Sequence, residues 1–196
     1  MLDVRGIATI QTADDITKLM SAIGDGDAAA YDDAVSLLYD ELHKLAHIQL
    51  AKRDTDNALQ TTALVNEAYL KLKHGAYKPV DRGHFLAIAA TAMRHIIIDY
   101  AKSRLAAKRG AGAVHIELDA NTGQIDAEAE QLLQINDALS RLREKHERLA
   151  RIFECKFFAG FDDDETAKAI NLSKRTVQRD WIKARAFLQE ELTPSS

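Results

Sequence analysis

Four side chains suited to contacting nucleic acid lie close together near the C-terminus: Lys174, Arg175, Gln178 and Arg179. Lysine and arginine pair with phosphates, and arginine and glutamine form hydrogen bonds with base edges in the major groove of DNA. Between residues 174 and 185 the chain carries five basic residues and one acid, Asp180. The sequence therefore favours DNA binding here over an ordinary amphipathic helix with a solvated charged face.

A helix must position these four residues. Val177, Trp181, Ala184 and Leu188 are spaced i, i+4, i+7 and i+11, so they share one face of a helix that can be buried. The basic residues then remain at the exposed N-terminal end. This is the part of a recognition helix that enters the major groove in helix-turn-helix proteins.

A shorter helix and a tight turn are predicted just before it. Acids fill residues 162–165, where the dipole of a helix N-terminus favours negative charge, and Thr166, Ala167 and Ile170 are spaced to bury one face. Asn171 tolerates a left-handed conformation, Leu172 can fill the space between the helices, and Ser173 can cap the second helix. Residues 162–188 are thus predicted to form a helix-turn-helix.

The whole chain is not generally basic. Its 196 residues are 46% hydrophobic and carry a net charge of −4, so contacts with DNA must come from local patches. Residues 1–60 carry eleven acids and five bases, whereas residues 94–109 carry five bases and one acid. This asymmetry indicates two partners of opposite character.

The single cysteine, Cys155, excludes a disulfide framework and a cysteine-based metal site. Its helical neighbours Ile152 and Phe158 indicate a core position. The N-terminus lacks a basic region followed by an apolar run, and no segment approaches the roughly 20 apolar residues of a membrane span. We expect a cytoplasmic protein with no membrane partner.

Helical spacing also dominates the rest of the chain. Residues 1–13 are expected to be an N-terminal extension. Helices are predicted over residues 14–23, 27–52, 60–73 and 84–108. In the last of these, Phe85, Ile88, Ala92, Ile96 and Tyr100 form an apolar stripe, and basic residues gather toward the end. Those bases suit both the helix dipole and a phosphate-binding edge.

A change of composition marks a linker at residues 110–130, which contain three glycines, five acids and no lysine or arginine. Beyond it, apolar residues between 132 and 153 predict two helices that pack on the helix-turn-helix. The predicted fold is all-α, with two small helical domains, residues 14–109 and 131–192, joined by a flexible linker.

Three segments together resemble a bacterial RNA polymerase sigma factor of the extracytoplasmic-function (ECF) type, within the sigma-70 family. They are LVNEAYLKL (64–72), FLAIAATAMRHIIIDYAKSR (85–104) and the C-terminal helix-turn-helix. The resemblance covers nearly all of the chain and implies no enzymatic activity and no cofactor. It implies that residues 14–109 bind core polymerase and recognise and melt the minus-ten element, and that residues 131–192 bind the minus-thirty-five element.

The resemblance also implies three sets of site residues. The set for the polymerase, which docks on the clamp helices of the largest subunit, is Leu64, Val65, Asn66, Glu67, Tyr69 and Lys71. The set for the minus-ten element is Arg94, His95, Asp99, Lys102, Arg104, Lys108 and Arg109. The set for the minus-thirty-five element is Lys174, Arg175, Thr176, Gln178, Arg179 and Lys183. His95 stands where many relatives have asparagine, which leaves the base preference open.

One departure from the family pattern concerns regulation. Where relatives commonly carry acids before the Leu-Val pair, this chain has Gln60, Thr61, Thr62 and Ala63, as in a group of sigma factors that lack the acidic polymerase-docking motif. A phosphate on Thr61 or Thr62 would add about −1.5 to −2 charge at a helix N-terminus. We hypothesise that phosphorylation there licenses polymerase binding. The alternative is that the threonines only start the helix.

Other functions have weaker support. A polymerase-independent helix-turn-helix regulator is the main alternative, but such proteins usually dimerise, and no sustained heptad is present. His43 and His47 are the only i, i+4 histidine pair and could form half of a metal site, which lacks an evident third ligand. The partners expected are core RNA polymerase, promoter DNA, and a Ser/Thr protein kinase or an anti-sigma factor.

Overall fold

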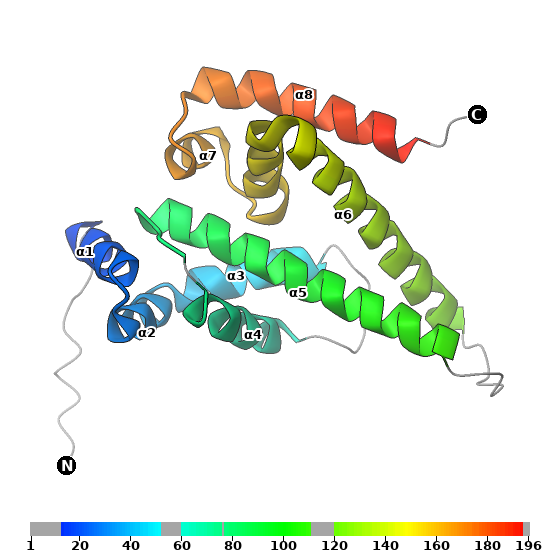
Figure 1. The fold of residues 1–196 in the computed structure, drawn as a ribbon, viewed down its shortest axis with the longest axis horizontal. Coiled ribbons are helices and arrows are strands. Elements are labelled where there is room, and N and C mark those ends of the chain that lie inside the picture. Colours follow the sequence, from blue (N-terminus) through cyan, green and yellow to red (C-terminus); the bar gives the residue numbers. More distant parts are fainter. Residues whose placement is uncertain (1–12, 52–59, 76, 111–119, 194–196) are drawn as a thin grey trace, which may run out of the picture.

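A computed structural model describes residues 13–51, 60–75, 77–110 and 120–193, and these residues form helices and loops without a strand (Figure 1). The prediction of an all-α fold is confirmed. The expected N-terminal extension, apart from Ala13, lies outside the described residues, as do residues 111–119 of the expected linker.

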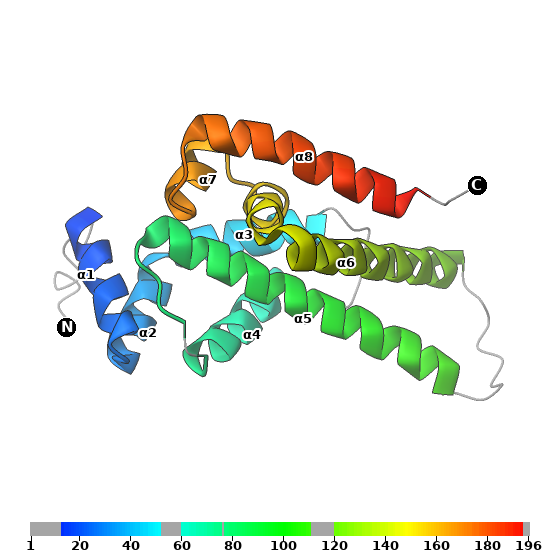
Figure 2. The same ribbon diagram turned by 45° about the horizontal axis from the view of Figure 1, so that its top comes forward.

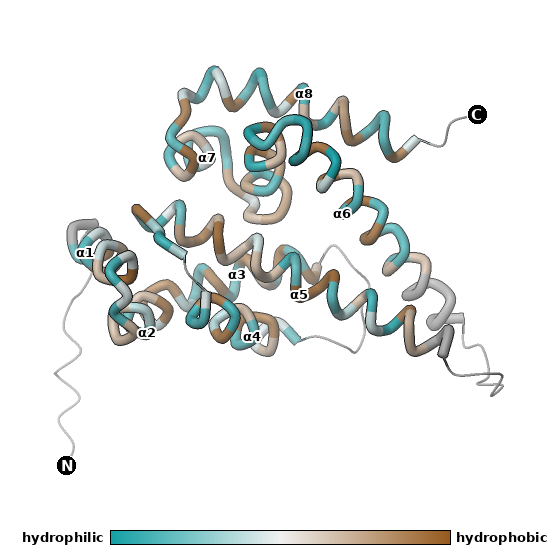
Figure 3. The backbone as a smooth tube through the Cα atoms, in the orientation of Figure 1, coloured by the Kyte–Doolittle hydropathy of each residue, from teal (hydrophilic) through white to brown (hydrophobic). Residues whose placement is uncertain are grey.

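Five helices form the N-terminal half: α1 (Ala13–Gly24), α2 (Ala28–Leu37), α3 (Tyr39–Ala51), α4 (Thr61–Lys73) and α5 (Arg82–Gly110). They enclose one hydrophobic core, in which Leu38, Leu64 and Met93 are almost fully buried. The brown colour along α5 in Figure 3 marks the apolar stretch that supplies much of this core.

The long helix expected over residues 27–52 is in fact two helices, so that prediction was wrong. Asp27 caps α2 by accepting hydrogen bonds from Ala29 N and Ala30 N, and the chain turns at Leu38, where φ is −100° and ψ is 12°. No glycine or proline marks this turn. Because Leu38 is itself only 1% exposed, packing in the core fixes the turn, and helical periodicity cannot show that.

Four elements form the C-terminal half: α6 (Ala120–Phe153), the π-helical turn η1 (Glu154–Phe158), α7 (Asp163–Ala169) and α8 (Lys174–Leu192). Helix α6 bends at His146, where φ is −149° and ψ is 73°. The bend divides α6 into two helical segments, in agreement with the two helices predicted before the helix-turn-helix. These segments pack with α8 around a second core that includes Leu139, Leu142 and Leu188.

The expected linker is shorter than predicted, because α6 begins at Ala120 rather than after residue 130. Residues 120–130 contain one glycine, no proline and several alanine, glutamate and glutamine residues, which are good helix formers. Ala129 and Leu132 are buried against the N-terminal core. This contact stabilises the start of α6, and composition alone does not reveal it.

Helix α5 lies between the two halves of the molecule (Figures 1 and 2). On one side it contacts α1, α3 and α4, and on the other it contacts α6, η1 and α7. The C-terminal helices therefore cover one side of the helix that the sequence assigns to the minus-ten element.

Candidate DNA and polymerase interfaces

Local capping fixes the junction between α7 and α8. Asp162 and Glu165 form a capping box, in which Glu165 N donates to Asp162 Oδ1 (2.8 Å) and Asp162 N donates to Glu165 Oε2 (2.9 Å). Asn171 adopts a φ of 54°, and Ser173 Oγ accepts a hydrogen bond from Thr176 N (3.2 Å). The left-handed turn at Asn171 and the cap at Ser173 are both confirmed.

Helix α8 buries the face that the spacing predicts. Val177, Ala184 and Leu188 are at most 4% exposed, and Trp181 is half-buried, stacked on Phe153 with the ring centroids 5.6 Å apart. The exposed members of the expected minus-thirty-five set are Lys174, Arg175, Gln178, Arg179 and Lys183, while Thr176 is half-buried beside the cap. The structure thus places the whole set within the first ten residues of α8.

Acids at the start of α7 contact two residues of this set. Lys174 Nζ lies 2.7 Å from Asp164 Oδ2, and Gln178 Nε2 donates to Asp163 Oδ2 (3.0 Å). Asp163 also pairs with Lys156 at 2.5 Å. The hydrogen bonds from Lys156 and Gln178 hold the pKa of Asp163 below its usual range, and the hydrogen bond with Asp164 raises that of Lys174.

A carboxylate that the sequence analysis did not single out lies beneath α8. Asp180 has no exposed surface. It accepts a hydrogen bond from Arg179 Nε (2.9 Å) and pairs with an Arg148 terminal nitrogen 2.8 Å away. Burial would raise the pKa of Asp180, but the hydrogen bond from Arg179 and the charge of Arg148 outweigh burial, so this pKa lies below its usual range.

Arg94, on α5, is buried between the two halves, only 4% exposed. Its guanidinium donates to Glu154 Oε1 (2.8 Å) and to Asn136 Oδ1 (2.6 Å), and Glu154 also pairs with Arg143 at 2.5 Å. The guanidinium carbon lies 5.5 Å from the centre of the Phe158 ring. In this arrangement Arg94 contacts the C-terminal half and does not reach the surface.

The other residues expected at the minus-ten element lie elsewhere along α5. His95, Asp99 and Lys102 are exposed, and Arg104 is half-buried. Asp99 pairs with Lys71 of α4 at 3.6 Å. Lys108 and Arg109 belong to the last turns of α5, but their side chains lie outside the described residues. Arg94 is therefore the buried member of its set, while His95, whose Nε2 lies 2.9 Å from a terminal nitrogen of Arg94, is exposed.

Helix α4 divides the expected polymerase-binding set into two groups. Leu64 and Val65 are at most 2% exposed and belong to the core. Asn66, Glu67 and Lys71 are exposed, and the hydroxyl of Tyr69 donates to Asp32 Oδ1 (2.9 Å). The exposed surface that can dock is therefore only part of the motif.

Leu70, which the predicted set omitted, is 54% exposed. Thr62, Asn66 and Leu70 follow one another at intervals of four residues and are all exposed, so they form one surface stripe on α4. The signal that could have identified Leu70 was its place within the family motif, four residues after Asn66 and so on the same helix face.

The two threonines lie at the start of α4 but do not cap it. The cap position belongs to Gln60, and no side chain caps this end by a hydrogen bond. Thr62 is exposed, Thr61 is half-buried, and the first turn contains no acid. No hydrogen bond at the start of α4 therefore supports the alternative, in which the two threonines serve as a helix cap.

The histidine pair predicted as half of a metal site gains no further ligands among the described residues. His43 and His47 lie on α3, and the described part of the chain contains no group of three or more histidine, cysteine, aspartate or glutamate residues that could hold a metal ion. Cys155 is buried, as expected, and burial raises the pKa of its thiol to about 12. Among the described helices, none is both long and apolar enough to cross a membrane.

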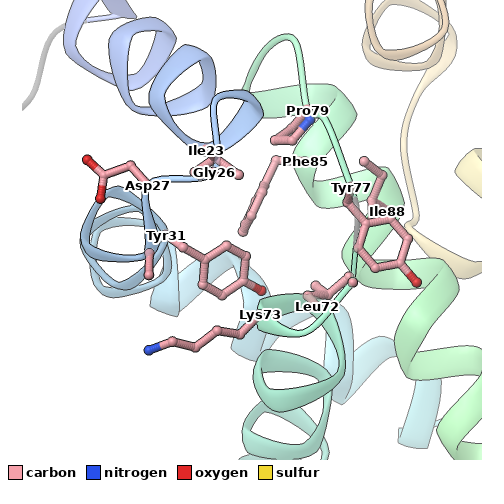
Figure 4. A pocket seen from close by; sticks show the side chains of 12 residues that line it. Ile23, Gly26, Asp27, Tyr31, Leu72, Lys73, Tyr77, Pro79, Phe85 and Ile88 are labelled. Atoms are coloured by element: carbon pink, nitrogen blue, oxygen red, sulfur yellow. The ribbon is translucent and has the colours of Figure 1, made fainter.

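One cavity of about 110 Å³ lies between α1, α2, α4 and α5, with Tyr31 and Phe85 at its wall (Figure 4). Burial, followed by the nearby Tyr69 and Asp32, raises the pKa of Tyr31. The Tyr31 hydroxyl has no hydrogen-bond partner among the described residues. A space of this size suits a few water molecules or a small group.

An all-helical chain whose last two helices meet at a tight turn, with basic residues at the exposed start of the second, has the architecture of helical DNA-binding proteins. The family model for ECF sigma factors matches residues 13–194, so the chain belongs to the ECF sigma factor family. Sigma factors of this family direct RNA polymerase to promoters. No curated protein matched the chain in a sequence comparison.

Proposed function

We propose that the protein binds core RNA polymerase through residues 14–109 and holds a minus-thirty-five element with α8. The observation that carries this proposal is the exposed set on α8, Lys174, Arg175, Gln178 and Arg179, in a chain of the ECF sigma factor family. Lysine and arginine would fix the register on phosphates, while arginine and glutamine would read base edges.

The minus-ten element would be met by α5, and this requires a change of arrangement. His95 and Lys102 are exposed, but Arg94 contacts Glu154 and Asn136 of the C-terminal half. If Arg94 contacts DNA, the C-terminal helices must first leave α5. We therefore propose that the protein opens between α5 and the α6–α7 surface when it joins polymerase and promoter.

Polymerase would dock on the exposed stripe of α4 formed by Thr62, Asn66 and Leu70. A phosphate on Thr62 would lie on this stripe, in a first turn that contains no acid, and the helix dipole would favour its charge. The absence of a side-chain cap from either threonine supports this role. Phosphorylation by a Ser/Thr kinase is therefore proposed as the step that supplies the negative docking surface.

Run-off transcription on a library of genomic fragments, with purified core polymerase and the protein in its unmodified and phosphorylated forms, tests the proposal. Defined start sites should appear only when the protein is added, and replacing Lys174, Arg175 and Arg179 together by alanine should abolish them. A matched control replaces three exposed lysines of the N-terminal half by alanine, Lys18, Lys44 and Lys78, and should retain binding to the fragments that give start sites. DNA binding by both forms of the protein, without any effect of either form on core polymerase, would instead favour an independent helix-turn-helix regulator.

The role of the threonines is tested with core polymerase alone. Phosphorylated protein should bind core polymerase more tightly than unmodified protein, and Thr61→Ala combined with Thr62→Ala should remove the difference. Tight binding of the unmodified protein, unchanged in the double variant, would contradict regulation at this site.

A further inference from the structure

Asp180 is an unusual residue for its position on α8. It has no exposed surface and lies on the side of the helix that also carries Val177 and Ala184, both fully buried. Burying a carboxylate is costly unless it is paired, and an apolar side chain of similar size often stabilises such a site equally well or better. Packing alone therefore does not explain an aspartate here.

The contacts of Asp180 join two arginines from different helices. Arg179 Nε lies 2.9 Å from Oδ1, and a terminal nitrogen of Arg148 lies 2.8 Å from Oδ2. Arg148 comes from α6, just beyond the bend at His146. One buried carboxylate thus accepts a hydrogen bond from one guanidinium group and forms an ion pair with a second.

Both guanidinium groups remain accessible. The side chains of Arg148 and Arg179 are 58% and 59% exposed, although the carboxylate between them is buried. Arg179 uses Nε for Asp180, so its two terminal nitrogens can point outward. Lys183 lies one helical turn beyond Arg179 and is also exposed, so α8 contributes two exposed cations to this surface and α6 contributes Arg148.

We propose that Arg148 is a DNA phosphate contact outside the recognition helix, and that Asp180 is a positioning residue that holds Arg148 and Arg179 in place. This inference rests on the proposed role of α8 in promoter binding. With two cations around one anion, the cluster keeps one net positive charge, which suits a phosphate beside the major groove. The partner is therefore the backbone of duplex promoter DNA.

Asp180 would act by limiting the freedom of the two side chains. A free arginine loses rotamer entropy when it binds a phosphate or a base, and a guanidinium already held by a carboxylate loses less. Arg179 is expected to be fixed most firmly, since the bond from its Nε to Asp180 orients the plane of the fork. Asp180 would therefore affect base discrimination through Arg179 and phosphate affinity through Arg148.

The test begins with selection of a binding sequence from random duplex DNA by the wild-type protein. If no sequence is selected, the proposed function of α8 fails. If one is selected, the labelled duplex is titrated with each variant between about 50 and 200 mM salt, with fluorescence anisotropy as the measurement.

Arg148→Ala should weaken binding and reduce the slope of log affinity against log salt by about one phosphate contact. Arg148→Lys should keep most of that slope. The matched control is Arg141→Ala, which removes the same charge from α6 at a site paired with Glu191 (2.6 Å). Equal slopes for Arg148→Ala and Arg141→Ala would refute the phosphate contact.

Asp180→Asn keeps the shape of the side chain but removes its charge. It should reduce discrimination between the selected duplex and a scrambled duplex by about tenfold, within the range expected for one base contact, at a temperature where circular dichroism shows the variant to be folded. A lower melting temperature with unchanged discrimination would show that Asp180 has only a structural role and would overturn its positioning role.

Discussion

The ion pair between Arg94 and Glu154 allows a quantitative test of how the two halves are held together. The two side chains are 4% and 9% exposed, and their charged atoms lie 2.8 Å apart. Glu154→Ala would leave the guanidinium of Arg94 buried without a charged partner, in contact with the neutral groups Asn136 Oδ1 (2.6 Å) and His95 Nε2 (2.9 Å). Loss of one partner of a buried pair costs about 3–5 kcal/mol, because the remaining charge is neither hydrated nor compensated.

Separation of the two halves would reduce this cost. If the C-terminal helices move away from α5, water reaches Arg94, and the penalty cannot exceed the free energy that keeps the halves together. We therefore expect Glu154→Ala both to lower the free energy of unfolding and to enlarge the molecule. Urea unfolding followed by circular dichroism measures the first effect, and the radius of gyration from small-angle X-ray scattering measures the second.

Two variants serve as controls for this prediction. Glu191→Ala breaks the exposed pair with Arg141 and should cost no more than about 1 kcal/mol without changing the radius. Arg94→Met combined with Glu154→Leu removes both buried charges and should recover most of the lost stability. The reasoning is refuted if Glu154→Ala costs no more than Glu191→Ala and leaves the radius of gyration unchanged.

Three further outcomes are expected. Partial burial, followed by nearby positive charge, lowers the pKa of His84 and also that of His95, whose side chain is exposed on one side only. The unfolded chain then binds more protons, so the melting temperature should fall as pH drops below about 6.5. His84→Gln combined with His95→Gln should flatten this profile in thermal unfolding, and an equally steep profile would contradict it. The Cys155 thiol, with a pKa raised by burial to about 12, should not react with a disulfide reagent at pH 8 until urea unfolds the protein. Asp162→Ala removes the cap of α7 and should lower the free energy of unfolding, measured in urea, by about 1 kcal/mol. An unchanged free energy of unfolding would show that the capping box does not stabilise the protein.

The junction of α7 and α8 could be predicted from the sequence because each of its signals acts over a few residues. Asp162 bonds to Glu165, Ser173 bonds to Thr176, and Asn171 sets its own backbone angle. The buried face of α8 follows from spacing alone. The gathering of basic residues at the exposed start of α8 was therefore predictable without knowledge of the rest of the fold.

Features that depend on contacts distant in sequence were not predictable. Arg94 and Glu154 are 60 residues apart, and nothing near either residue marks the pair. The apolar stripe of α5 was expected to include Tyr100, which is 39% exposed. Steps of four residues advance by about 40° around a helix, so the buried face passes instead to Ala101 and Leu105.

The bonds from Lys174 to Asp164 and from Gln178 to Asp163 have a consequence for the choice between promoters and other DNA. In the proposed complex, a DNA phosphate takes the place of the Asp164 carboxylate beside Lys174. On DNA of random sequence, Lys174 then only exchanges one anion for another, so this contact adds little to the binding free energy. A promoter also offers base edges, which a carboxylate cannot imitate. The acids of α7 would therefore reduce the gain from phosphate contacts alone, and only slightly, because the pair of Lys174 and Asp164 is exposed. A larger share of the affinity would then depend on base contacts, which favours the correct sequence.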